Sequence, residues 1–241
     1  MNKNFKIILA FVYMLSFGIL LYFIFHYLDF KDFKDLNDYS YIRDKSEILL
    51  DFKDKKLFLF IFLFFIFSII WVLFLGFASP LAIMSGFIFG KWYGTIISVF
   101  SFTIGCTLLY ILAKFYLKNF IEKKLGLKIA KYKNFFNKNE FFYFMIFRII
   151  GGAGTPFAVQ NILPVIFDMK LKNYFYSTFL GLIPTIFIVN SLGEGIEKII
   201  QNNEQLNYLN FISDPAIYWP ITCFIILLIT SFFVKKKLFK E

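Results

Sequence analysis

Of the polar side chains inside the long apolar stretches of this sequence, where polar groups are costly to bury, five are candidates for binding a ligand. They are Ser79, Arg148, Thr155, Gln160 and Asn161. A guanidinium presents a planar fork of N–H donors that suits a phosphate, and the N-terminal N–H groups of short broken helices can point at the same anion. The set therefore predicts binding of an anionic headgroup, with Arg148 as its main contact.

These residues do not predict an enzyme. A hydrolytic site needs a nucleophile, a base or a metal ion within mutual reach. The apolar stretches hold no carboxylate and no histidine at depth, and Glu140 and Asp168 lie at the two ends of the segment that contains Arg148. We expect no catalytic residue, no metal ion and no cofactor.

Arg148 stands out because lysine supplies nearly all of the positive charge, and Arg43 is the only other arginine. A charge at the centre of a bilayer costs about 2.5–3.5 kcal/mol on insertion scales, so it needs a cavity or a partner. In an alternative interpretation, Arg148 binds the carbonyls of a broken hairpin or reaches the cytoplasmic edge of the membrane near Glu140.

The composition is that of an integral membrane protein. Of its 241 residues, 59% are hydrophobic and 17% are charged, whereas soluble domains average about 45–50% and about 25%. Uncharged runs long enough to cross a bilayer fix the class. The net charge of +10 then predicts lysine-rich cytoplasmic segments rather than nucleic-acid binding.

Four apolar stretches have the length of full membrane spans, namely 1–27, 92–113, 173–193 and 215–234. A charged segment (28–56) and a basic loop (114–140) lie between these stretches, and a basic tail (235–241) follows the last one. In the charged segment Phe30, Phe33 and Leu36 recur every three residues, which fits either an amphipathic helix on the bilayer surface or a solvated linker.

Two further apolar stretches break in the middle. As one straight helix, 57–90 would be about 50 Å long, against a hydrocarbon core of about 30 Å. Helix-breaking residues interrupt it at Gly76 and Pro80, and interrupt 141–167 at Gly152, Gly154 and Pro156. We predict two re-entrant hairpins, 57–91 and 141–169, with these residues at the bends.

The two bends share the pattern G-x-[AG]-[ST]-P at an offset of 76 residues, and Gly105 and Gly181 in the following spans keep the same offset. Each unit is a hairpin followed by a span, and the two units enter from opposite sides. This predicts an all-α polytopic membrane protein built on an inverted repeat, with one additional helix at each end, an organisation typical of secondary transporters. Irregular backbone at membrane depth then implies a shared polar cavity; the alternative is two kinked helices packed through glycine.

The charge pattern sets the expected orientation. Four spans and two hairpins leave both termini on one side, and placing them in the cytoplasm puts most of the lysines inside. We expect a multi-pass protein of the bacterial inner membrane in which 28–56 and 194–214 lie outside.

Residues 57–200 resemble the DedA-like, SNARE-associated (VTT-domain) family. The resemblance rests on the order of Gly76, Pro80, Gly86, Gly90 and Gly94, then Phe144-x-x-x-Arg148, Gly152 through Pro156, Asn161, Gly181 and Pro184. It implies two opposed re-entrant hairpins and movement of lipids between leaflets, with phosphatidylethanolamine or a polyprenyl phosphate carrier as bacterial cargo and proton coupling in some members. Arg148 matches the family's basic position. The first hairpin lacks the acidic residues that the bacterial DedA branch places there.

Two functions follow as hypotheses. In the first, the chain is a lipid transporter or scramblase whose cavity lies between the hairpins and whose headgroup contacts are the five polar residues named at the outset. In the second, it is a structural or trafficking protein that recruits partners through its basic 114–140 loop. Membrane lipids are the expected partners, nucleic acid is not, and a homo-oligomer is left open.

Overall fold

The computed structural model describes residues 39–74, 77–201 and 215–238, and its regular elements are helices. The chain divides into two units, Met1–Leu49 and Leu50–Glu241, and the helical core belongs to the second. The predicted N-terminal span (1–27), the Phe30–Leu36 stripe, Gly76 and the segment 202–214 lie outside the described residues.

Within the predicted charged segment, α2 (Tyr39–Lys55) is a helix. Ion pairs between residues four apart support it, from Arg43 to Glu47 and from Lys55 to Asp51, each at 2.9 Å, as expected on an exposed helix surface. The next helix, α3 (Leu57–Leu73), follows at once, and the bend between Ser46–Lys55 and α3 is 114°.

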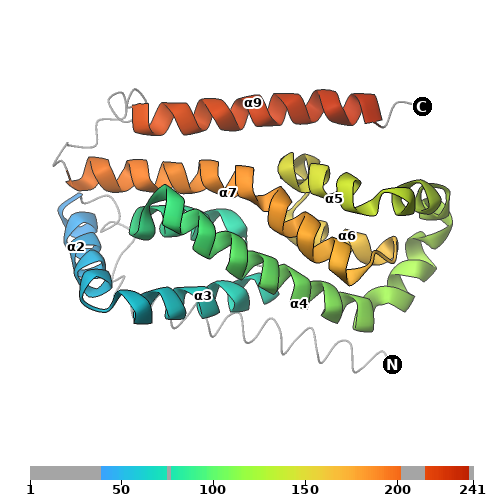
Figure 1. Ribbon diagram of the computed structural model, residues 1–241, viewed down its shortest axis with the longest axis horizontal. Helices are drawn as coiled ribbons and strands as arrows, with labels where there is room; N and C mark the ends of the chain where they lie inside the picture. Colours follow the sequence, from blue (N-terminus) through green and yellow to red (C-terminus); the bar gives the residue numbers. More distant parts are fainter. Residues whose placement is uncertain (1–38, 75–76, 202–214, 239–241) are drawn as a thin grey trace. The chain divides into compact units, whose positions relative to one another are not determined.

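After α3 the chain turns back into α4 (Ala78–Lys138). Ser79 and Pro80 were expected at the first bend but belong to the first turn of the helix, where proline costs no hydrogen bond. The ring of Phe89 lies 5.4 Å from that of Phe64, so residues 78–89 run back along α3 (Figure 1).

A second reversal occurs within α4 at Gly90. Its φ of +73° interrupts the helix, in a region that glycine adopts without strain. The Ser85 hydroxyl donates to the carbonyl of Gly94 at 3.0 Å, although nine residues of straight helix would extend about 13 Å. Residues 78–89 are therefore a short arm that folds back on the long helix beginning at Lys91.

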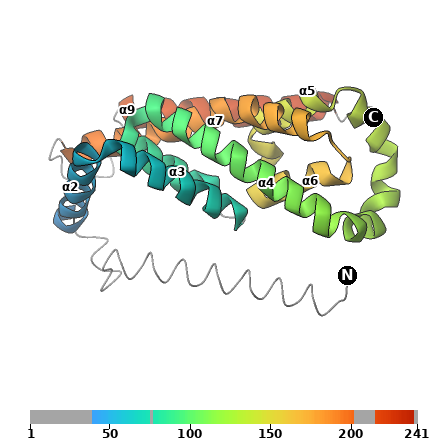
Figure 2. The same ribbon diagram turned by 60° about the horizontal axis from the view of Figure 1, so that its bottom comes forward.

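The predicted second hairpin is α5 (Glu140–Ile149), the 3₁₀ turn η2 (Gly151–Gly154) and α6 (Phe157–Ile166). Gly151 and Gly152 have φ values of +63° and +68°, which reverse the chain where the break was expected. After α6, Asp168 takes a left-handed φ of +57°, and α7 (Leu171–Gln201) follows. α6 lies beside α4 (Figure 2).

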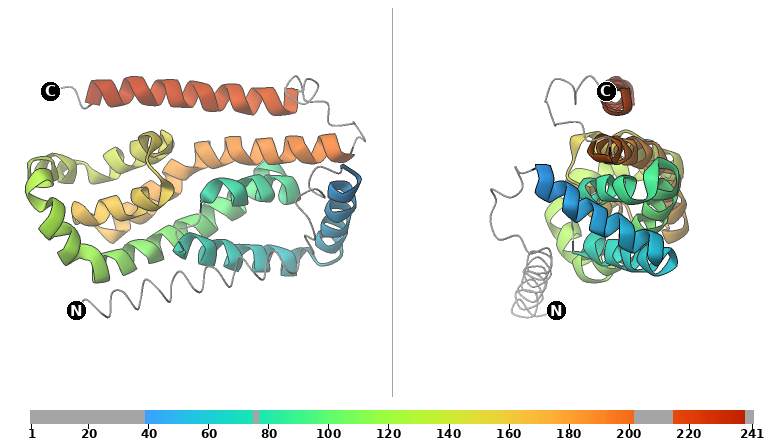
Figure 3. Two further views of the ribbon diagram at one scale, coloured as in Figure 1. Left: turned by 180° about the vertical axis from the view of Figure 1, so that it is seen from behind. Right: turned by 90° about the vertical axis from the view of Figure 1, so that its left-hand side faces the viewer.

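The predicted basic loop differs from the structure, because α4 keeps a helical backbone through Lys138. Lysine is the commonest residue of this segment and is a good helix former, so high charge alone does not interrupt the helix. The last described helix, α9 (Pro215–Leu238), contacts α7 and lies along it (Figure 3).

Two described helices are long and apolar enough to cross a membrane, Ala78–Tyr116 and Leu171–Gln201, and the bent pair ending in α3 would be a third. They contain the predicted spans 92–113 and 173–193. Within α9 the apolar stretch is shorter and covers Ile217–Ile226. Large apolar side chains such as Phe58 and Phe62 on α3 are 87% and 61% exposed, as suits a surface that faces lipid. The chain is an all-helical membrane protein.

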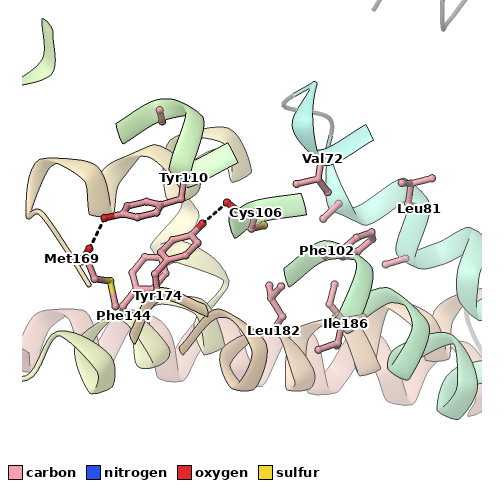
Figure 4. Packing of buried hydrophobic residues seen from close by; sticks show 14 of the residues in the cluster. Val72, Leu81, Phe102, Cys106, Tyr110, Phe144, Met169, Tyr174, Leu182 and Ile186 are labelled. Atoms are coloured by element: carbon pink, nitrogen blue, oxygen red, sulfur yellow. Dashed lines mark hydrogen bonds between the residues drawn. The ribbon is translucent and has the colours of Figure 1, made fainter. Parts of the chain in front are cut away.

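The core lies where α3, α5 and α6 pack on the α4–α7 pair, with Val72, Phe102, Phe144, Tyr174 and Ile186 among its residues (Figure 4). Two glycines set the spacing of these helices. A Cβ on Gly105 would lie 2.9 Å from the Cβ of Val72 and 3.2 Å from the Ile69 carbonyl.

The same contact recurs in the second half of the chain. A Cβ on Gly181 would lie 2.4 Å from the Cβ of Arg148 and 2.9 Å from the carbonyl of Met145. Adding 76 to Ile69, Val72 and Gly105 gives Met145, Arg148 and Gly181. The α5–α7 contact therefore uses the positions that the α3–α4 contact uses, at the offset seen in the sequence.

Candidate functional site

Arg148 occupies the last turn of α5 and is the largest of the fully buried side chains, with 1% exposure. Gly181 of α7 makes room for it, because any side chain there would collide with the Cβ of Arg148. The carbonyl end of α5 provides partial compensation for the positive charge. The local sequence thus places a cation at the break between α5 and α6.

The guanidinium hydrogen bonds to residues of two other helices. Its Nη1 donates to Oε1 of Gln160 at 3.3 Å, and its Nη2 donates to Oδ1 of Asn161 and to the hydroxyl of Tyr174, the latter at 3.2 Å. Gln160 and Asn161 lie on α6 and Tyr174 lies on α7, so Arg148 links three elements. The alternative interpretation of Arg148 placed it on hairpin carbonyls, whereas its described partners are side chains.

Aromatic rings surround the same cation. The guanidinium carbon lies 5.0 Å from the ring centre of Phe144, 5.5 Å from that of Phe157 and 6.0 Å from that of Tyr174. Ring faces attract cations, more strongly where water is absent. These contacts lower the cost of burying the charge without neutralising it.

The charge of Arg148 has no carboxylate partner among the described residues, since none of their ion pairs includes it. In addition, Nε of Arg148 and Nδ2 of Asn161 are buried without a hydrogen-bond partner. Both are donors. A buried cation with spare donors is complementary to an anion that only accepts hydrogen bonds, which describes a phosphate oxygen.

The hairpin break is tied to this site through Gln160. Its Nε2 donates to the carbonyls of Gly151, at 3.2 Å, and Thr155, at 2.8 Å. The Thr155 hydroxyl in turn donates to the carbonyl of Gly152 at 2.6 Å. One amide side chain thereby satisfies two carbonyls of the irregular backbone and accepts a bond from Arg148, so that the conformation of the break and the position of the cation depend on each other.

Tyr174 was not predicted from the sequence, yet it joins the site to the core. Its hydroxyl donates to the carbonyl of Cys106 at 3.2 Å, and its ring stacks on Tyr110 with 4.5 Å between centres. The Tyr110 hydroxyl donates to the carbonyl of Met169. Figure 4 shows this column of rings between α4 and α7. Because 68 residues separate Cys106 from Tyr174, no local pattern announces the contact.

Glu140, which the sequence placed near the membrane surface, is buried at 7% exposure. Its Oε1 accepts from the backbone N–H of Lys170 at 3.2 Å and from Nδ2 of Asn173 at 2.6 Å. A carboxylate at the start of a helix satisfies N–H groups that lack a partner within the helix. Glu140 therefore fixes the start of α7 against the start of α5.

The structure brings together Arg148, Gln160 and Asn161 from the predicted headgroup set, with Thr155 attached through its carbonyl. Ser79 is exposed in the first turn of α4 and makes none of the described hydrogen bonds of this group. No cluster of three or more His, Cys, Asp or Glu side chains that could hold a metal ion occurs in the part of the chain that the structure describes.

Comparison with known families identifies one match, between residues 77–195 and the VTT domain. The matched segment begins at the first turn of α4 and contains the α5–α6 hairpin, most of α7 and every side chain that contacts Arg148.

The curated proteins similar to this chain include these three. It is 26% identical over 137 residues to the transmembrane protein 41 homolog of Caenorhabditis elegans, covering 54% of this chain and 55% of that protein. It is 28% identical over 115 residues to the uncharacterized protein YqeD of Bacillus subtilis, covering 47% and 54%. It is 25% identical over 179 residues to the transmembrane protein 41 homolog of Dictyostelium discoideum, covering 70% and 49%. The chain thus spans about half the length of these relatives, and no solved structure matches it.

Proposed function

We propose that this chain, which belongs to the VTT-domain family of membrane proteins, moves a phospholipid or a polyprenyl-phosphate carrier between leaflets, with Arg148 binding the phosphate of the headgroup. The observation that carries the proposal is the buried guanidinium that lacks a carboxylate partner among the described residues and retains an unpartnered Nε. A purely structural arginine in an apolar bundle is expected to have all of its donors satisfied.

The proposed route lies between two re-entrant hairpins related as an inverted repeat. Residues 78–89, α5 and α6 are 10 to 12 residues long, or about 15–18 Å. They are therefore too short to cross a hydrocarbon core of about 30 Å. The glycine contacts repeated at an offset of 76 support the relation between the two halves. Broken helices that meet within the membrane are the usual places for polar cargo.

The described conformation is closed, because Arg148, Asn161 and Tyr174 are each no more than 1% exposed. A headgroup can reach the guanidinium only if the α5–α6 hairpin separates from α4 or α7. The phosphate would then accept from Nε of Arg148 and Nδ2 of Asn161, the two donors that the closed site leaves unused. Binding would replace the cost of unpaired donors with charge-assisted hydrogen bonds.

The proposal keeps the orientation inferred from charge, with both termini and residues 114–140 in the cytoplasm and the protein in a bacterial inner membrane. It gives the protein no catalytic residue or cofactor. In the competing hypothesis, the lysine-rich 114–138 part of α4 recruits a protein partner and no lipid moves.

Leaflet exchange in proteoliposomes tests the proposal. Vesicles are made with a fluorescent phospholipid in both leaflets, and dithionite quenches only the outer one. The wild-type chain should let quenching proceed beyond the outer half, at a rate that rises with the number of protein copies per vesicle. Quenching that stops at the same level as in protein-free vesicles would rule out lipid movement and leave the recruitment hypothesis.

A further inference from the structure

An ion-pair cluster joins α4 to the turn between α6 and α7. Asp168 Oδ1 lies 2.9 Å from Nζ of Lys114, and its Oδ2 lies 3.0 Å from Nζ of Lys118. The two lysines are one helical turn apart, so a single carboxylate bridges them. These hydrogen bonds hold the pKa of the Asp168 carboxyl at about 2, and this carboxyl is therefore ionised at neutral pH. These three residues form the Asp168 cluster.

The Asp168 cluster lies next to the column of rings that covers Arg148. One turn before Lys114 on α4, Tyr110 donates to the carbonyl of Met169 and stacks on Tyr174, which is a direct partner of Arg148. One further turn back is Cys106, whose carbonyl accepts from Tyr174. These contacts lie one after another on a single face of α4. If this end of α4 moved away from the α6–α7 turn, they would break and Arg148 would be uncovered.

A second cluster closes the opposite end of the α4–α7 pair. Glu194 of α7 accepts from the backbone N–H of Lys91 at 2.8 Å, directly after the reversal at Gly90. Its Oε1 lies 2.6 Å from Nζ of Lys198 and 3.6 Å from Nζ of Lys91. These residues form the Glu194 cluster. Subtracting 76 from Glu194 gives Lys118, so one residue of each cluster occupies the same position of the repeat, with opposite charge.

The two clusters are separated by the thickness of a membrane. Lys91 and Lys114 lie on one continuous stretch of α4, and the helical rise between them amounts to about 35 Å, slightly more than the hydrocarbon core of about 30 Å. Trp92 and Tyr93, beside the Glu194 cluster, are 67% and 73% exposed, and exposed Trp and Tyr are enriched at the membrane–water boundary. Each cluster therefore belongs to one membrane surface.

We propose that the Asp168 and Glu194 clusters are the two gates of the Arg148 site, the first holding α4 to the α6–α7 turn at one membrane surface and the second holding α4 to α7 at the other. The inference rests on the proposed function, because it assigns the gates to the passage of a headgroup. With both clusters formed, the site is closed, as described. Release of one cluster at a time opens the site to one surface while the other stays shut.

The buried thiol of Cys106 reports opening at the first gate. Cys106 has no exposed surface, and the sequence contains only one other cysteine, Cys223, which is exposed. In the full chain carrying Cys223→Ser, the rate of modification by N-ethylmaleimide then measures access to Cys106 alone. Asp168→Asn removes the charge and suits the left-handed backbone, which asparagine tolerates.

Asp168→Asn should accelerate modification of Cys106 by between about twofold and about 25-fold, because each of two partly exposed ion pairs shifts an opening equilibrium by a factor of about 1.5 to 5. Lys114→Gln combined with Lys118→Gln should give the same acceleration and add nothing to Asp168→Asn. Asp51→Asn, which removes the exposed ion pair with Lys55, is the matched control and should leave the rate unchanged.

The salt dependence of the modification rate in the wild-type protein tests the same ion pairs without relying on the folding of a variant. Raising the salt concentration from about 0.1 M to about 1 M shortens the screening length from about 10 Å to about 3 Å, so it should speed modification when Asp168 is present and not in Asp168→Asn. Equal rates in wild type, Asp168→Asn and Asp51→Asn, without this salt effect, would overturn the first gate.

The second gate needs its own reporter. Ser98 is fully buried on α4 between the two clusters, so Ser98→Cys in a chain carrying Cys106→Ser and Cys223→Ser serves the same purpose. Glu194→Gln should accelerate its modification severalfold, and an unchanged rate would overturn the second gate. Thiol access does not depend on lipid movement. If the gate variants change the rate of thiol modification but the protein exchanges no lipid, the transport proposal is refuted. If the protein exchanges lipid but the variants leave the rate of thiol modification unchanged, only the gates are refuted.

Discussion

A methyl group added at Gly181 tests whether the position of Arg148 is set by close packing of α5 on α7. The new Cβ would lie 2.4 Å from the Cβ of Arg148 and 2.9 Å from the carbonyl of Met145. Carbon atoms in contact are normally about 3.5–4.0 Å apart. Neither neighbour is the mobile end of a side chain, so α5 and α7 must move apart by about 1 Å.

Two costs follow from that separation. Overpacking of a well-packed core typically costs about 1–3 kcal/mol. The bond from Arg148 to Tyr174, now 3.2 Å long, would also be lost, and a hydrogen bond to a charged group contributes about 1.5–3 kcal/mol. We therefore expect Gly181→Ala to lower the free energy of unfolding by about 2.5–6 kcal/mol and to slow leaflet exchange by at least about tenfold.

Gly105→Ala is the matched variant, because its Cβ would meet Val72 at 2.9 Å and the Val72 side chain has no hydrogen-bonding group. We expect a loss of about 1–3 kcal/mol. Leu180→Ala, at a position that is 43% exposed, should have little effect. Thermal unfolding in detergent, read from the tryptophan fluorescence, would rank the three. Gly181→Ala unfolding at the temperature of Leu180→Ala would refute the packing argument.

Three other outcomes are expected. Gly152→Ala should detach Gln160 from Arg148, because the new Cβ would lie 2.1 Å from Cδ of Gln160 at a φ of +68°. Leaflet exchange should then slow by at least about tenfold in a protein that still accumulates, and exchange at the wild-type rate would contradict this. Asp168→Asn should destabilise the protein by the same amount at all pH values above about 5, and by less as the pH falls from about 4 towards 2. The reason is that the pKa of Asp168 is lowered from 3.8 to about 2, so the native ion pairs are lost only as the carboxylate protonates. A constant difference in stability between wild type and variant across that range would show that the charge is not responsible. In intact cells, an impermeant thiol reagent should not reach Lys128→Cys, and labelling there would reverse the proposed orientation.

The main breaks of the fold could be predicted because glycine and proline act locally. The reversal at 151–154 and the end of the first short arm at Gly90 both lie where the sequence concentrates residues that interrupt helices. The helix through 114–138 was not predicted, because a run of lysines was interpreted as a loop although its residues favour helix.

The site could be predicted only in part, for a similar reason. Arg148, Gln160 and Asn161 are recognisable because each is a polar residue in an apolar stretch, and a short hairpin brings them together. Tyr174 and Asp168 acquire their roles from α4, 68 and 50 residues away in the chain, so no local pattern reveals them. Ser79 shares its motif with Thr155, but a motif does not say which face of a helix is buried, and the structure leaves Ser79 exposed.

The most direct test of the central claim compares wild type with Arg148→Ala and Arg148→Lys in the dithionite assay, at equal protein per vesicle. Wild type should exchange the fluorescent phospholipid, Arg148→Ala should not exceed protein-free vesicles, and Arg148→Lys should retain part of the rate, because lysine keeps the charge but not the planar set of donors. A single cooperative thermal unfolding transition would show that Arg148→Ala is folded, although its midpoint should fall because the substitution leaves a cavity and unpaired polar groups. Exchange by Arg148→Ala at the wild-type rate would contradict the assignment of Arg148 as the phosphate-binding residue.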